Sequence, residues 1–101
     1  MQYAIEGGAL RFVFEHNPTA SNVNKYLQYM YQTIDSKERF HEVVIDFNKV
    51  EYIDSTGVTF LIGLYRYLQK EDKIMRVINA RLEIVELFEI VNLTNLFQVN
   101  R

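Results

Sequence analysis

The chain has 101 residues, of which 49% are hydrophobic and 24% are charged; this balance is that of an ordinary globular domain and excludes a disordered chain. Its net charge of −2 comes from intermixed acidic and basic residues, which argues against nucleic acid as a partner, because proteins that bind it concentrate positive charge. No apolar run is long enough to span a bilayer, no signal peptide begins the sequence, and no cysteine is present to form a disulfide. We therefore expect one cytoplasmic domain, residues 1–101, without direct membrane insertion.

The first part of the sequence predicts a hairpin followed by a helix. Residues 3–5 and 10–14 have the composition of strands, and Gly7 and Gly8 between them are a turn signal of the hairpin kind. Apolar residues then recur at helical spacing over residues 23–34, which indicates an amphipathic helix. A polar connection is expected at residues 35–38.

The second part of the sequence predicts strands that alternate with helices. Residues 43–47 and 74–78 are short, nearly continuous apolar runs, typical of strands buried on both faces. Residues 55–70 have a long helical pattern, a third helix is expected from residue 79 or 80 through 90, and residues 96–99 predict a last strand or short helix. This alternation predicts an α/β fold with a mixed sheet, right-handed crossovers and helices that cover mainly one side.

The most informative stretch is Asp54-Ser55-Thr56-Gly57, which stands between a predicted strand and a predicted helix. Free backbone N–H groups and the positive end of the helix dipole would lie at this turn, so an added phosphate would be stabilised there. The hydroxyl is then either a phosphoacceptor or a helix cap. The tetrapeptide alone favours the cap, because Ser, Thr and Asp are common at that position.

Two further motifs accompany this turn. Ile45-Asp46-Phe47 precedes it, and Arg81-Leu82-Glu83-Ile84-Val85-Glu86-Leu87-Phe88-Glu89-Ile90 follows it. Together with Tyr52-Ile53 before the turn, they resemble a STAS domain, and within that family most of all the bacterial anti-sigma factor antagonists. In those proteins an "I-D" step precedes an acceptor serine in D-S-[ST]-G, and an "R-L-x-x-L-F" helix comes later. The resemblance is clear over residues 43–99 and faint over residues 1–42.

The resemblance implies a role for each residue of the turn. Ser55, directly after the aspartate, would be the phosphoacceptor, with Thr56 as the second candidate. Asp54 would either position the hydroxyl or cap the helix. Gly57 would either admit the backbone of a partner or merely ease entry into the helix.

The helix that begins at this turn predicts a contact surface. At 100° per residue, the face expected to pack on the sheet consists of Val58, Leu61, Ile62, Tyr65 and Leu68. The residues expected to turn partly outward are Thr59, Phe60, Gly63, Leu64, Arg66 and Tyr67. Large apolar side chains on an outer face often mark a contact surface, although neighbouring helices would also account for them. The expected partner-binding residues are Asp54, Thr56, Gly57, Thr59, Phe60, Gly63 and Tyr67.

The function that the resemblance implies is partner switching. The unphosphorylated domain would bind an anti-sigma factor that is also a serine kinase, phosphorylation of Ser55 would release it, and a serine phosphatase would reset the cycle. A non-catalytic STAS subunit of a membrane transporter is the alternative. An enzyme fits poorly, because no phosphate loop is present and His16 and His41 stand alone. No cofactor or metal is expected.

Two segments depart from the family pattern. The "G-x-L-D" step at the end of the second strand is here Val13-Phe14-Glu15-His16, and the often glycine-rich turn before the fourth strand is Glu71-Asp72-Lys73. The first segment contributes to the surface that faces the kinase in the family, so this departure concerns the identity of the partner. Neither departure touches the phosphoacceptor motif.

Overall fold

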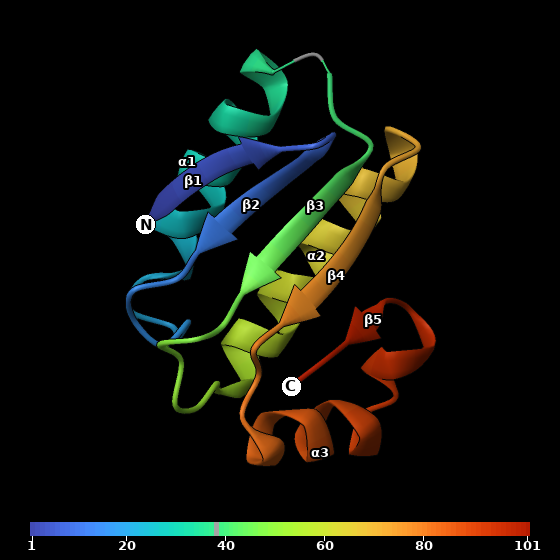
Figure 1. Ribbon diagram of the computed structural model, residues 1–101. Helices are drawn as coiled ribbons and strands as arrows, with labels where there is room; N and C mark the ends of the chain where they lie inside the picture. Colours follow the sequence, from blue (N-terminus) through green and yellow to red (C-terminus); the bar gives the residue numbers. More distant parts are fainter. Residues whose placement is uncertain (38) are drawn as a thin grey trace.

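The computed structural model describes residues 1–37 and 39–101. Five strands form one mixed sheet in the order β1-β2-β3-β4-β5 (Figure 1). β1 (Gln2–Glu6) and β2 (Ala9–Val13) form an antiparallel hairpin, while β3 (Glu42–Asp46), β4 (Ile74–Ile78) and β5 (Gln98–Val99) continue the sheet in parallel with β2. The mixed sheet predicted from the alternation of strands and helices is confirmed.

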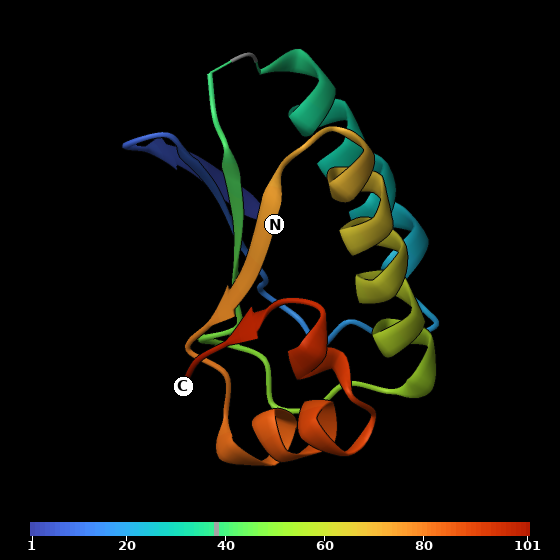
Figure 2. The same ribbon diagram turned by 90° about the vertical axis from the view of Figure 1, so that its right-hand side faces the viewer.

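Helices cover one face and one end of this sheet. α1 (Val23–Ser36) and α2 (Ser55–Lys70) lie side by side against the same face (Figure 2). α3 (Leu82–Ile90) and the short 3-10 helix η1 (Leu93–Asn95) lie toward the end where the parallel strands finish (Figure 1). The part of the chain that the structure describes places no helix on the opposite face, so the predicted one-sided cover is also confirmed.

Some element boundaries differ from the sequence-based expectation. Asp35 and Ser36 belong to α1 and not to the polar connection expected after it, of which Glu38 lies outside the described residues. The third helix begins only at Leu82, because Asn79 adopts a left-handed φ of 58° that a helix cannot contain. The expected last element is a strand of two residues, β5, and η1 precedes it.

The core fills the space between the sheet and the two long helices. Alternate strand side chains on this face are at most 3% exposed, as the period of a strand requires: Leu10, Phe12, Val43, Ile45, Met75 and Val77. On the other face Val44 is also only 3% exposed, and in the register of the strands it stands between Arg11 and Arg76. The aliphatic stems of these two arginines are placed to cover it.

The side chain of Asp46, at the end of β3, connects this strand to the turn between β4 and α3. The residue is 6% exposed, and its Oδ1 accepts hydrogen bonds from the Asn48 N–H at 2.9 Å and from Asn79 Nδ2 at 3.1 Å. Its Oδ2 lies 4.0 Å from Nη1 of Arg11. Because a buried carboxylate is tolerated only where it is hydrogen-bonded, Asp46 is part of the scaffold that fixes this end of the sheet.

Candidate functional site

The first turn of α2 presents the hydroxyl of Ser55 at the surface. Asp54 precedes the helix with extended backbone angles, and its Oδ1 accepts a hydrogen bond from the Gly57 N–H at 2.8 Å. Asp54 is therefore the helix cap, one of the two roles left open for it. Since the cap is supplied by its neighbour, Ser55 is not needed for that role, and its side chain is exposed.

The same aspartate fastens the turn to the loop that follows β2. Its second oxygen, Oδ2, accepts a hydrogen bond from the Ala20 N–H at 3.1 Å. Asn17, in the same loop, accepts through Oδ1 from the backbone N–H groups of Glu51 at 2.7 Å and Tyr52 at 3.3 Å. Each of the two segments thus binds the backbone of the other through a side chain, and the turn at Ser55 is held in place by contacts that do not involve the Ser55 hydroxyl.

Gly57 is buried beneath this turn. A Cβ atom at this position would lie 2.3 Å from the backbone oxygen of Pro18 and 2.4 Å from Cγ1 of Ile53. No side chain larger than hydrogen fits without a shift of the backbone. The backbone that approaches Gly57 in the structure is the chain's own, at Pro18.

The expected outward orientation of Phe60 and Leu64 is wrong. Phe60 is 6% exposed and Leu64 is fully buried, and the Phe60 ring packs edge-on against Phe14 with centroids 6.0 Å apart. Leu61 and Leu68 are buried as predicted, whereas Val58, Ile62 and Tyr65 are only half-buried. The physical reason is that α2 is flanked by α1 on one side as well as packed on the sheet, so its apolar arc is wider than a single face.

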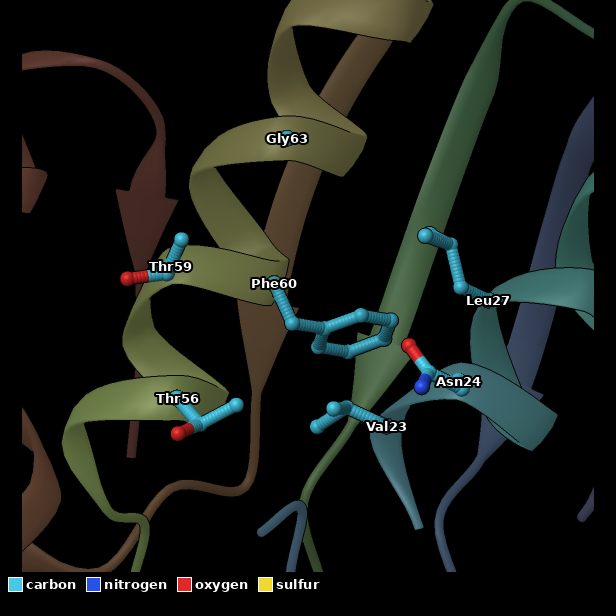
Figure 3. A pocket seen from close by; sticks show the side chains of 7 residues that line it. All are labelled: Val23, Asn24, Leu27, Thr56, Thr59, Phe60 and Gly63. Carbon is cyan, nitrogen blue, oxygen red and sulfur yellow. The ribbon is translucent and has the colours of Figure 1, made fainter. Parts of the chain in front are cut away.

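Phe60 nevertheless contributes to a groove between α1 and α2. The groove has a volume of about 230 Å³ and is lined by Val23, Asn24, Leu27, Thr56, Thr59, Phe60 and Gly63. Figure 3 shows the Phe60 ring extending from α2 toward α1, where Val23 and Leu27 lie. Four of the residues expected to bind a partner, from Thr56 to Gly63, are therefore brought together along one groove.

A second hollow adjoins Ser55 on the side of α3. It has a volume of about 330 Å³ and is lined by Ile53, Asp54, Ser55, Val58, Thr59, Leu87 and Val91. Val91, which lines this hollow, is 43% exposed, and Tyr52, which precedes the lining residue Ile53 in the chain, is 57% exposed. None of the residues expected to bind a partner lies in the third helix, so this surface was not predicted. The signal was Val91, an apolar residue directly after the expected end of that helix at residue 90.

Tyr67 is not part of the surface around Ser55. Its ring stacks on Tyr31 of α1, with centroids 4.2 Å apart, and its hydroxyl donates a hydrogen bond to Asp35. This hydrogen bond, together with burial, raises the pKa of Tyr67 to about 12. Twelve positions of a regular helix separate Tyr67 from Ser55, about 18 Å along the axis, so the structure places Tyr67 at the other end of α2.

In residues 1–37 and 39–101, no group of three or more His, Cys, Asp and Glu side chains is arranged to hold a metal ion, and His16 and His41 belong to none. Across the same residues, no helix combines the length and hydropathy needed to cross a membrane.

The fold and the site together define a small α/β domain in which the exposed hydroxyl of Ser55 lies at the start of a helix. The model of the STAS domain family matches residues 4–101, and the chain belongs to this family. The anti-sigma-B factor antagonist of Staphylococcus epidermidis is 33% identical over 64 residues, which cover 63% of this chain and 59% of that protein. The chain is therefore matched to less than two thirds of this relative's length. The resemblance to anti-sigma factor antagonists is confirmed.

Solved structures share the fold at low sequence identity. An anti-sigma factor antagonist (STAS) domain protein from Planctomyces limnophilus has a TM-score of 0.83 at 12% identity, over 98% of this chain and 87% of that chain. The Bacillus cell fate determinant SpoIIAA in its phosphorylated form has a TM-score of 0.72 at 15% identity, over 99% and 89%. The STAS domain of a SulP transporter from Vibrio cholerae has a TM-score of 0.76 at 12% identity, over 97% and 77%. At these identities the similarity establishes the fold alone.

Proposed function

We propose that this protein is an anti-sigma factor antagonist that works by phosphorylation-controlled partner switching. The observation that carries the proposal is the exposed Ser55 hydroxyl at the first position of α2, beside an aspartate that already caps the helix. The similarity to the S. epidermidis antagonist supports the general role. In this proposal the protein is a binding module and a kinase substrate, and it is not a catalyst.

The proposed cycle has three steps. The unphosphorylated protein binds an anti-sigma factor that is also a serine kinase, and the sigma factor is released. The kinase then transfers the γ-phosphoryl group of ATP to Oγ of Ser55: an O–P bond forms, the bond to the leaving ADP breaks, and a base of the kinase takes the hydroxyl proton. A serine phosphatase hydrolyses the phosphoserine and restores the binding form.

Charge explains why phosphorylation would end the complex. A phosphoserine adds a charge of about −1.5 to −2, next to the Asp54 carboxylate and at the rim of the hollow lined by Val58 and Leu87. The N–H groups and dipole at the start of α2 would stabilise this charge within the protein itself. A partner docked over the same hollow would have to desolvate the phosphate. Phosphorylation would therefore destabilise the complex and not the fold.

The proposed docking surface follows the exposed residues of the first turns of α2. Ser55, Thr56 and Thr59 are exposed, and Thr59 lines both the groove beside α1 and the hollow beside α3. Gly63 extends this surface, and a Cβ atom there would meet no other atom within 4 Å. Phe60 offers the partner only the part of its ring that lines the groove, and Gly57 supports the turn from below.

The proposal is tested by titration calorimetry with the anti-sigma factor kinase of the same organism. Ser55→Asp should bind at least tenfold more weakly than the parent, a loss of about 1.4 kcal/mol, whereas Ser55→Ala should bind nearly as well. Ser36→Asp, which adds the same charge at the exposed end of α1, is the matched control and should not change the affinity. Equal affinities for Ser55→Ala and Ser55→Asp would overturn the electrostatic account.

A second candidate is a non-catalytic STAS subunit of a membrane transporter complex. The similarity of the fold to the STAS domain of a SulP transporter favours it. The two proposals differ in the role of Ser55. Partner switching requires its hydroxyl, whereas a scaffold does not, since Asp54 already caps the helix. Co-purification with a membrane permease that Ser55→Asp leaves intact would favour the transporter.

A further inference from the structure

β1 is an open edge of the sheet. It pairs with β2 on one side, and no strand among the described residues pairs with its other side (Figure 1). An exposed edge presents unpaired N–H and C=O groups to which another strand can add, and proteins commonly block such edges with Lys, Pro, bulges or very short strands. β1 has five residues, no Lys, no Pro and an uninterrupted register with β2. The opposite edge strand, β5, has only two residues.

The hairpin turn determines which backbone groups of β1 point outward. Gly7 and Gly8 have φ values of 55° and 86°, which fit a two-residue turn of the primed kind. Such a turn is closed by hydrogen bonds between the flanking residues, here Glu6 and Ala9. Hydrogen-bonded and non-hydrogen-bonded positions alternate along an antiparallel pair. The N–H and C=O groups of Tyr3 and Ile5 therefore face away from β2.

A second copy of β1 fits this edge in one antiparallel register, centred on Ala4. In that register Tyr3 of each copy stands opposite Ile5 of the other, and their outward backbone groups meet in hydrogen-bonded pairs. Tyr3 and Ile5 are 40% and 49% exposed, and an aromatic side chain opposite a β-branched one is a favourable cross-strand pair. On the other face Gln2 stands opposite Glu6, whose carboxylate already lies 3.6 Å from Arg11, so no like charges are opposed.

We propose that this protein forms a symmetric dimer through antiparallel pairing of β1 with β1, which joins the two sheets into one. The occupant of the edge is a second copy of the chain because the outward backbone groups and the apolar pair are complementary to themselves and no like charges are opposed. Figures 1 and 2 show the start of α2 in the helix layer, at the end of the molecule where β3 and β4 finish, and not at this edge. The dimer goes beyond the proposed function and leaves the Ser55 turn of each copy open.

Sedimentation equilibrium of the full chain tests the proposal through Ile5→Pro. Because the N–H of residue 5 faces outward, proline removes a donor from the edge and none from the β1–β2 pairing. The parent and the control Ile5→Val should sediment as dimers, and Ile5→Pro as a monomer with an unchanged circular dichroism spectrum. A parent that stays monomeric at millimolar concentration would overturn the proposal, as would Ile5→Pro remaining a dimer.

A disulfide test checks the register without a destabilising substitution. In the proposed dimer the two Ala4 residues form a non-hydrogen-bonded pair, with Cα atoms about 4.5 Å apart, a separation that a disulfide can bridge. The natural chain has no cysteine, so Ala4→Cys introduces the only thiol. Mild oxidation should convert Ala4→Cys to a covalent dimer, while Gln98→Cys on the exposed part of β5 should stay monomeric. Equal rates of cross-linking for the two variants would contradict the register.

Discussion

The two ends of α2 are attached to the rest of the molecule by different groups. At the first turn the attachment is made by Asp54, which caps the helix and binds the Ala20 N–H, and by the close approach of Gly57 to Pro18. At the last turns it is made by Tyr67, which stacks on α1 and donates a hydrogen bond to it. The hydroxyl of Ser55 takes no part in this attachment, because Asp54 caps the helix in its place. The hydroxyl of Tyr67, in contrast, is hydrogen-bonded to Asp35.

This difference shows where a modification can act as a switch. A side chain can be phosphorylated and dephosphorylated without loss of the fold only where the fold does not depend on that side chain. Along α2, we therefore expect substitutions of the attaching residues to change stability. Substitution of Ser55 should instead change binding.

The largest expected effect on stability is that of Phe60→Ala, between the two ends. Phe60 is 6% exposed and packs against Phe14, so its removal leaves a cavity and should cost about 3–5 kcal/mol. Thr59→Ala, at the neighbouring exposed position, is the control and should cost less than about 1 kcal/mol. Urea denaturation of the two variants measures both values. A small loss for Phe60→Ala would contradict the placement of its ring in the core.

The two glycines of α2 offer a sharper comparison of its attached and exposed positions. Gly57→Ala places a Cβ atom against Pro18 and Ile53 and should destabilise the fold by about 1–3 kcal/mol. Gly63→Ala meets no atom within 4 Å and should stabilise it by about 0.5–1 kcal/mol, because alanine favours the helix. The melting temperature measured by thermal denaturation should therefore fall for Gly57→Ala and rise for Gly63→Ala. A shift of the same sign in both would contradict the close packing at Gly57.

Asp54→Ala tests the cap at the first turn. The substitution removes the acceptor for the Gly57 and Ala20 N–H groups and should cost about 1 kcal/mol, up to about 2 kcal/mol. Asp54→Asn keeps an acceptor oxygen of the same shape and should cost less. If Ser55→Ala destabilised the protein as much as Asp54→Ala does, the serine would be the cap and the freedom of its hydroxyl would be refuted.

Tyr67→Phe is expected to have the smallest effect and a distinctive pH dependence. The pKa of Tyr67 is raised from 10.0 to about 12 in the folded protein, so its contribution to stability is present below pH 10 and is lost as the pH rises toward 12. Because the site is half-exposed, loss of the hydrogen bond should cost less than about 1 kcal/mol at neutral pH. The difference between parent and variant in urea denaturation should shrink above pH 10. A difference that is constant with pH would exclude the hydrogen bond to Asp35.

Much of this fold could be predicted because its periodicities are unambiguous. Short apolar runs indicated the strands, the helical spacing of apolar residues over 23–34 and 55–70 indicated the long helices, and the polar stretch at Asp54 indicated the turn between strand and helix. The rotation of α2 could not be predicted, because a helix that contacts both a sheet and another helix has an apolar arc that fits two orientations. Contacts between loops, such as Asp54 with Ala20 and Gly57 with Pro18, join residues distant in sequence, and no local pattern reports them.

The most direct test of the central claim is to identify the phosphorylated residue. The parent, Ser55→Ala and Thr56→Ala proteins are incubated with ATP and the anti-sigma factor kinase of the same organism, and their peptides are mapped by mass spectrometry. We expect one phosphate, on Ser55, in the parent and in Thr56→Ala, and none in Ser55→Ala. Phosphate on Thr56 alone, or undiminished phosphorylation of Ser55→Ala, would contradict the assignment of Ser55 as the switch.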